Sequence, residues 1–177
     1  MRCSAWLLAV LIFGASHVPV LAHDKPSAPP KKPASGVYVV LRESSKEKDV
    51  LPLKDREVLV INRHRYLKKD DSQPPLFVVV GSAPDVALDL AEKPKAEKEG
   101  KEVVRILLKL RPKAATALER VTADCRGKQI AIVLGGEVVT MHKVRQVIKG
   151  GTVQITSCAT GAANYLLEQL EAHQANK

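Results

Sequence analysis

Aromatic side chains are scarce in this chain, which has one tryptophan, three tyrosines and two phenylalanines in 177 residues. Trp6 and Phe13 fall in an apolar stretch near the amino terminus, so the remainder keeps only Tyr38, Tyr66, Phe77 and Tyr165. Proteins that hold single-stranded nucleic acid stack the bases on aromatic rings. The shortage of rings therefore argues against a nucleic-acid partner, although the formal net charge is +9.

Motifs that carry chemistry are missing as well. The sequence has no Cys/His spacing typical of a zinc site and no Asp-rich calcium loop. Gly150-Gly151 lacks the Lys-Ser/Thr pair that follows the glycines of a phosphate-binding loop. Cys158 and His142 are the residue types of a nucleophile and a base, but no glycine elbow, orienting residue or oxyanion motif accompanies them. The sequence predicts no catalytic, cofactor-binding or metal-binding residue, and no enzyme.

The chain has one long apolar run, residues 5–15, close to the amino terminus. Arg2 precedes this run, and Val20 and Ala22 occupy the two positions that a signal peptidase reads. The run is shorter than the roughly 20 apolar residues that a membrane-spanning helix needs. The pattern predicts a signal peptide at 1–22, cleaved near Ala22, and a periplasmic or secreted mature protein.

Cysteine is rare too, and Cys125 and Cys158 are the two that remain after the predicted cleavage. In an oxidising compartment an even pair favours one disulfide bond. Whether the two thiols meet depends on the topology, and two buried free thiols are the alternative. Cys125 and Cys158 are therefore a candidate disulfide.

The chain has 28 basic and 19 acidic side chains, and most of the charges are interleaved. Residues 23–35 are rich in Pro, Lys and Ala, which predicts a disordered, partly extended tether. The basic stretch 25–32 and the cluster 63–69 would attract anionic lipids or polymers weakly. An electrostatic binder of anionic envelope components is thus one candidate function.

Residues 36–90 predict a small β-rich unit. Apolar side chains alternate or run together in three of its segments. We expect strands at 36–42, 57–62 and 76–80. Ser82 is placed to cap a short helix of about two turns that ends near Leu90.

Residues 91–102 are mostly Lys and Glu. Pro94 and Gly100 disfavour a continuous helix. The segment therefore predicts a charged linker, with a solvated helix as the alternative.

Residues 103–173 give the clearest pattern of the chain. Apolar side chains alternate at 104–110, which predicts a strand with one buried face. Pro112 suits the first turn of a helix that ends before Gly127. The unbroken apolar run at 130–134 predicts a central strand that is covered on both faces.

Gly135-Gly136 then predicts a tight turn into a returning strand. The chain bends again at Gly150-Gly151, forms a short strand around Ile155 and ends in an amphipathic helix that Thr160 can cap. The order β-α-β-β-(β)-α predicts an α+β, ferredoxin-like fold, in which two helices pack on one face of an antiparallel sheet. The small β-rich segment precedes this domain.

This second half resembles a known family. The matching parts are a helix with Thr122 near its end, the Gly127-Lys128 step, the strand 130–134 with its glycine turn, the Gly150-Gly151 bend, and an Ala- and Leu-rich helix at 162–170. Together they are similar to the periplasmic head of the protein-export subunit SecD, in the SecD/SecDF family, over about residues 103–173. Gly135 stands where that family usually has Asp, and His142-Lys143 replaces its small residue and Pro.

The resemblance implies a function without catalysis. In that family the membrane part couples proton flow to movement of the head, which holds the emerging preprotein. No segment of transmembrane length follows the head here, so the resemblance implies the binding role alone. We expect a non-enzymatic exported protein without a cofactor that binds polypeptides, or an envelope or protein-export assembly, through strand edges or apolar grooves. The electrostatic binder, and an unrecognised thiol hydrolase that uses Cys158, are the alternatives.

Overall fold

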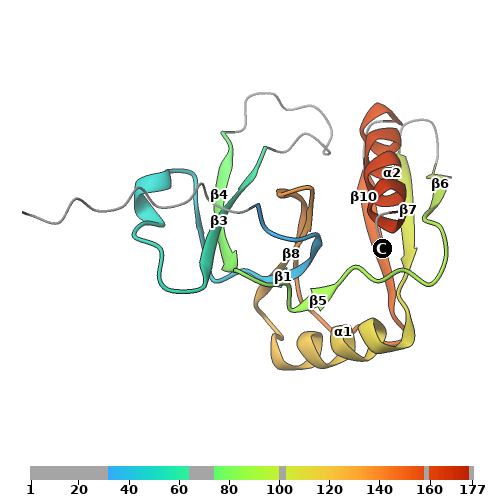
Figure 1. Ribbon diagram of the computed structural model, residues 1–177, viewed down its shortest axis with the longest axis horizontal. Helices are drawn as coiled ribbons and strands as arrows, with labels where there is room; N and C mark the ends of the chain where they lie inside the picture. The colour runs from blue at the N-terminus through green and yellow to red at the C-terminus, as the bar shows by residue number, and fades with distance from the viewer. Residues whose placement is uncertain (1–31, 64–73, 100–102, 158–159, 176–177) are drawn as a thin grey trace, which may run out of the picture. The chain divides into compact units, whose positions relative to one another are not determined.

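The computed structural model describes residues 32–63, 74–99, 103–157 and 160–175, and Figure 1 traces them as coloured ribbon. The predicted signal peptide and most of the predicted tether lie outside these residues, as does most of the basic cluster 63–69. Residues 32–177 form one unit.

Strands outnumber helices in the described part of the chain. Its elements are, in order, β1 (Gly36–Val39), β2 (Arg42–Ser44), a 3-10 turn (Glu47–Asp49), β3 (Glu57–Asn62), β4 (Leu76–Gly81), β5 (Val86–Ala87), β6 (Lys95–Glu99), β7 (Val103–Lys109), α1 (Pro112–Asp124), β8 (Gln129–Leu134), β9 (Glu137–Lys143), β10 (Thr152–Ser157) and α2 (Thr160–Ala175). They form two sheets and two helices.

The larger sheet has the strand order β2-β4-β3-β9-β8-β1-β5. β1 and β2 belong to one continuous segment that changes partner within one residue. The Val40 N–H donates to the Gln129 carbonyl of β8 at 2.9 Å, and the Leu41 N–H donates to the Val79 carbonyl of β4 at 2.9 Å. The sheet therefore curls back on itself, because β1 and β2 join its two halves.

The curl separates the apolar side chains into two clusters, with β8 between them. Alternate side chains of a strand point to opposite faces, and residues 130–134 are all buried. The inner cluster contains Tyr38, Val60, Val78, Val80, Ala131, Val133 and Val138. Ile130, Ile132 and Leu134 point outward into a larger cluster shared with both helices and the smaller sheet. The prediction of a central strand covered on both faces is confirmed.

The smaller sheet is antiparallel, with the order β10-β7-β6. β7 lies in the middle and buries Val104, Ile106 and Leu108. α2 packs against β7 and β10, whereas α1 lies against β5 of the larger sheet (Figure 1). The main contacts of the two helices are therefore with different sheets.

The predicted ferredoxin-like sheet needs correction. The mixed α+β class and the order of elements from β7 to α2 agree with the prediction. A single sheet would pair β7 with the hairpin β8–β9, but β7 pairs with β6 and β10, and β8 pairs with β1. Both outer edges of the β8–β9 hairpin are occupied, by β1 next to β8 and by β3 next to β9. The strands therefore divide between two sheets, and the helices do not share one face.

Two local predictions in the first half also differ from the structure. The strand expected at 36–42 divides into β1 and β2. Residues 82–90 form no helix, because Val86 pairs with Val37 in β5. The Asp85 carboxylate accepts the Val39 N–H of β1 at 2.7 Å.

Residues 95–99 form β6 where a charged linker was predicted. The side chains of residues 95–98 are exposed, as is common in an edge strand protected by charge. Residues 36–90 and 103–173 pack together, because β1 pairs with β8 and both segments contribute to the larger cluster.

Gly151 lets β10 approach α1 closely. Gly150 and Gly151 both have a positive φ, of +72° and +67°. A Cβ at Gly151 would overlap the Cβ of Ala115 in α1, whereas a Cβ at Gly150 would meet nothing within 4 Å. The Gly151 carbonyl also accepts the Leu110 N–H at 2.9 Å. Gly151 therefore fixes the start of β10 against the first turns of α1.

Two alanine variants separate backbone strain from overlap. Gly150→Ala should cost about 1–2 kcal/mol in unfolding free energy, because only the left-handed backbone is strained. Gly151→Ala adds overpacking against Ala115 and should cost about 1–3 kcal/mol more. Urea denaturation of both variants measures the difference. Equal losses would mean that the contact between Gly151 and α1 contributes nothing.

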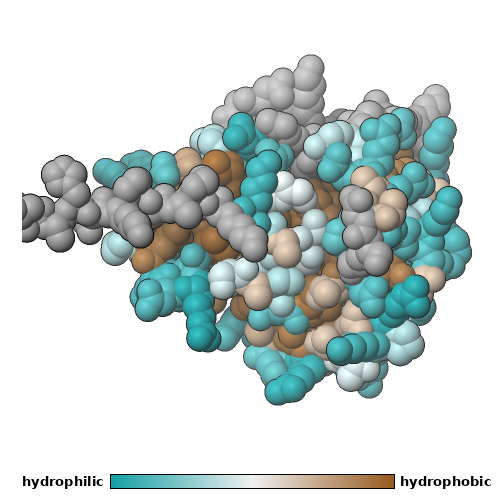
Figure 2. Space-filling model, in the orientation of Figure 1, coloured by the Kyte–Doolittle hydropathy of each residue, from teal (hydrophilic) through white to brown (hydrophobic). Residues whose placement is uncertain are grey.

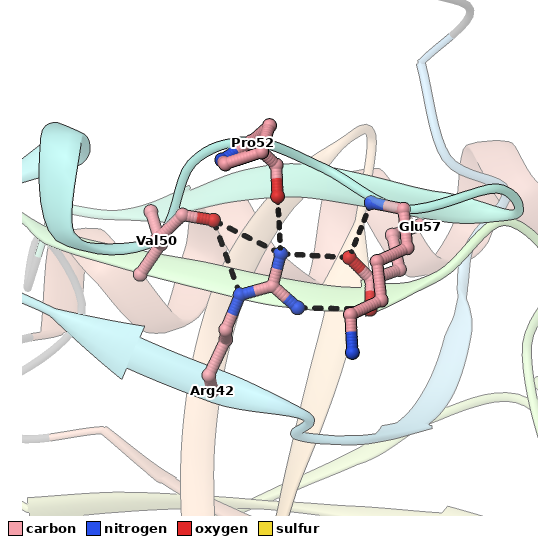
Figure 3. Close-up of polar contacts among 5 residues, drawn as sticks. Arg42, Val50, Pro52 and Glu57 are labelled. Carbon is pink, nitrogen blue, oxygen red and sulfur yellow. Dashed lines mark hydrogen bonds and ion pairs between the residues drawn. The ribbon is translucent and has the colours of Figure 1, made fainter.

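Arg42 holds the loop before β3 (Figure 3). Its guanidinium pairs with the Glu57 carboxylate at 2.7 and 2.8 Å and donates to the carbonyls of Val50 and Pro52 at 3.0 Å. The Lys54 N–H donates to Glu57 at 2.8 Å. The bond from Arg42, and after it the bond from Lys54, lower the pKa of Glu57 to about 2.

The lowered pKa predicts a pH-dependent contribution to stability. Glu57 has a folded pKa of about 2 against an unperturbed 4.5, so its contribution is complete above pH 4.5 and is lost as the pH falls towards 2. Glu57→Gln should be less stable than the wild type at neutral pH, and the difference should shrink over this range. Urea titrations at successive pH values measure it. Glu47→Gln, an exposed carboxylate of the same loop, is the control, and a Glu57→Gln deficit that stays constant down to pH 2 contradicts the prediction.

Candidate functional site

A groove lies between β8 of the larger sheet and β10 of the smaller sheet. Two adjoining hollows form it, with volumes of about 560 and 340 Å³, and they share Ile130, His142 and Ile148. We call it the β8–β10 groove, which is lined by Ile130, Ile132, residues 142–146, Ile148 and residues 152–154.

A β-bulge in β9 sets the direction of the side chains at this groove. The register against β8 shifts so that Ile132 pairs with Thr140, whereas Val133 pairs with Val138. Val139 is the extra residue, which has no opposite partner. The bulge reverses the alternation of side chains beyond it.

The reversal brings His142 to the groove. In a regular strand, alternation from the inward-facing Val138 would place the side chains of Thr140 and His142 on the inner face. With the bulge, both share the outer face with Ile130 and Ile132, which are their partners in the register. His142 Nε2 lies 2.9 Å from the Thr140 hydroxyl oxygen, so the two side chains form a hydrogen bond.

The wall of the groove is the segment 144–151, which is anchored at both ends. The Val144 N–H donates to the Lys128 carbonyl at 2.8 Å, and the Val144 carbonyl accepts the Gly127 N–H at 2.9 Å. The Gly150 carbonyl accepts a hydrogen bond from Lys109 Nζ at 2.8 Å. The wall is thus tied to the turn after α1 and to the end of β7.

Thr122 provides an anchor in the middle of the wall. This residue is fully buried in α1. Its hydroxyl donates to the Leu118 carbonyl at 2.8 Å, and its oxygen accepts the Ile148 N–H at 3.0 Å. Because Ile148 lines both hollows, Thr122 couples α1 to the shape of the groove.

Thr122→Val tests this coupling. The change keeps the side-chain shape but removes the acceptor, which leaves the Ile148 N–H unpaired at a cost of about 1–3 kcal/mol in unfolding free energy. Thr122→Ser keeps the oxygen and should retain most of the stability. Urea denaturation compares the two variants, and equal stability of Thr122→Val and Thr122→Ser would exclude a contribution from this bond.

β10 borders the groove with its outer edge. Among the described residues, β10 pairs with β7 on one side and is the end strand of its sheet. The Leu110 N–H donates to the Gly151 carbonyl, so the alternation of an antiparallel ladder turns the backbone groups of the next residue, Thr152, away from β7. An extended chain could add at this edge through backbone hydrogen bonds, with its side chains in the groove.

A second hollow, of about 450 Å³, lies at the Gly135-Gly136 turn between β3 and α2. Tyr165, which is 47% exposed, lines it. Arg63 Nε lies 3.7 Å from Glu137 Oε1, and the Lys32 side chain packs on Gly136. The charges of both signs and the pairing of Arg63 give this hollow no clear chemical preference.

Apolar surface also occurs over the β3–β4 part of the molecule (Figure 2). The large exposed aliphatic side chains are Leu41, Leu51 and Leu53. They belong to residues 41–57, where basic and acidic side chains are equally numerous. Single exposed leucines are normal on protein surfaces, so these residues form a reference surface with which the groove can be compared.

The structure does not bring the residues singled out in the sequence into one site. Cys125 is buried at the end of α1. Cys158 lies outside the described residues, so its pairing with Cys125, and its relation to His142, stay predictions. His142 itself is exposed and contacts Thr140.

No group of three or more His, Cys, Asp or Glu side chains among the described residues is placed to hold a metal ion. None of the described helices is long and apolar enough to cross a membrane.

Comparison with protein-family models matches residues 67–173 to the SecDF P1 head subdomain. The match spans more than half of the chain, and the protein belongs to this family. The match confirms the resemblance seen at 103–173, and it begins earlier, so that it includes β4, β5 and β6. No curated protein matches the chain.

Solved structures of SecDF are also similar to parts of the chain. A SecDF described as a membrane component that enhances protein export is 29% identical with a TM-score of 0.46, over 54% of this chain and 42% of that one. A SecDF in a super-membrane-facing form has the same identity and TM-score, over 13% of its own length. The translocon-associated SecDF from Thermus thermophilus is 16% identical with a TM-score of 0.41, over 85% of this chain and 31% of that one. The chain spans less than half the length of each.

Proposed function

We propose that the protein is a non-enzymatic polypeptide-binding module that holds an extended segment in the β8–β10 groove. The observation that supports this proposal most directly is the position of an end strand, β10, beside an apolar groove. Backbone groups at the edge would give affinity for any extended chain, and the groove would accept its apolar side chains.

The rigidity of the groove favours binding. Its floor belongs to the central strand β8, and its wall is tied down at Val144, Ile148 and Gly150. A preformed groove loses less conformational entropy when a ligand binds, so more of the contact energy appears as affinity.

Membership of the SecDF P1 head family supports a role for this binding in protein export. The partner would be a polypeptide in transit or an envelope assembly, encountered in the periplasm or outside the cell after cleavage near Ala22. The electrostatic alternative depends on residues 25–32 and 63–69, most of which lie outside the described residues.

Titration with an unfolded polypeptide tests the proposal. The probe is a fluorescein-labelled synthetic peptide of about twelve residues in which Val and Thr alternate. Fluorescence anisotropy measures its binding. Ile148→Asp puts a charge on the groove wall and should weaken binding at least about tenfold, which corresponds to 1.4 kcal/mol. Leu53→Asp makes the same kind of change on the exposed reference surface and should leave the affinity unchanged.

A second variant keeps the test independent of the folding of Ile148→Asp. Thr152→Pro removes an N–H that points away from β7, a position where an edge strand tolerates proline. It should weaken binding, and Thr152→Ala should not. Equal affinity of Ile148→Asp, Thr152→Pro and the wild type would overturn the proposal. Binding that disappears at physiological ionic strength, where charges are screened beyond about 8 Å, would support the electrostatic alternative instead.

A further inference from the structure

The charges around the β8–β10 groove are of one sign. Lys143 and Arg145 line the end of the groove next to β9, and His142 lies between the two hollows. No Asp or Glu lines either hollow. Lys143 and Arg145 are exposed, and neither forms an ion pair with any carboxylate among the described residues.

Other hollows of the same molecule differ in this respect. The hollow at Gly135-Gly136 contains Glu137, which pairs with Arg63. The hollow between β5 and α1 is lined by Asp85 and Asp89 together with Lys113. The cationic end of the β8–β10 groove therefore reflects its own residues and not only the basic composition of the chain.

We infer that the groove selects extended polypeptide segments that carry acidic residues at one end of an apolar stretch. This inference rests on the proposed function and specifies its substrate class. The apolar side chains occupy the part of the groove formed by Ile132, Ile148 and Val153, and the acidic side chains reach Lys143 and Arg145 at the other end. Basic segments are disfavoured, because their charges would lie against unpaired cations.

The arrangement gives selectivity without demanding a particular sequence. The edge of β10 offers hydrogen bonds to the backbone of the bound segment, and these bonds do not depend on side chains. The apolar floor accepts side chains of several shapes. The charge at one end then discriminates among segments, since charges at the rim of an interface affect specificity more than total affinity.

Three synthetic peptides test the inference with the full chain. Each has the same alternating Val and Thr residues, and the last three residues are Asp, Asn or Lys. The Asp peptide should bind about two- to fivefold more tightly than the Asn peptide for each exposed ion pair formed, and the Lys peptide should bind most weakly. The preference for Asp should fall as salt is added, because these pairs are exposed.

Matched variants locate the preference. Lys143→Gln with Arg145→Gln should abolish the difference between the affinities of the Asp and Asn peptides. Lys46→Gln with Lys48→Gln removes two exposed cations at the same spacing in the loop before β3, and it should keep the full preference. Circular dichroism and urea denaturation confirm that both double variants are folded.

The outcomes separate this inference from the proposed function. If all three peptides bind equally and Ile148→Asp weakens each of them, the groove binds polypeptides without charge selection, and the inference is wrong. If none of the three binds, the proposed function itself fails. An Asp preference that survives the loss of Lys143 and Arg145 would place the selecting charges elsewhere and would also overturn the inference.

Discussion

The structure depends on the need to cover β8 on both faces. Residues 130–134 are apolar without a break, so every side chain of this strand needs a hydrophobic environment whichever way it points. The curl of the larger sheet covers one face, and the helices with the smaller sheet cover the other. The groove lies on this second side, where Ile130 and Ile132 of β8 and residues 152–154 of β10 line one hollow.

The groove is built by residues that are distant in the sequence and act on one another through the backbone. Thr122 in α1 sets the position of Ile148, and the bulge at Val139 turns His142 to the outer face. Neither Thr122 nor Val139 lines the groove itself. Membership of the SecDF P1 head family is consistent with a role in protein export, and the groove supplies a physical means by which the chain could hold a partner.

Local structure was predictable where one residue type dictates the backbone. Pro112 begins α1 as expected, Gly127 follows the end of that helix, and Gly135 and Gly136 have the positive φ angles of the predicted turn. β3 also has the bounds that the sequence predicted, residues 57–62. The pairing of strands was not predictable, because both β1 and β7 have suitable apolar faces and only the folded chain decides which of them meets β8. β6 was not predicted, because its exposed Lys and Glu residues show no hydrophobic periodicity.

The groove could not be predicted from the sequence. Val138 and Val139 are both apolar, so the sequence does not reveal the bulge at Val139. The wall of the groove is shaped by a hydrogen bond from another element.

The two edge strands of the smaller sheet, β6 and β10, differ in how readily they accept a further strand. β6 presents a row of exposed lysine and glutamate side chains, and a strand that approached it would have to desolvate them. β10 presents its border beside a hydrophobic hollow. Such a sheet can add one strand at β10, and it has no second edge at which another strand could add. Under the proposed function, each molecule would therefore capture one segment at a time, with one-to-one stoichiometry, and captured chains would not nucleate fibrils through this sheet.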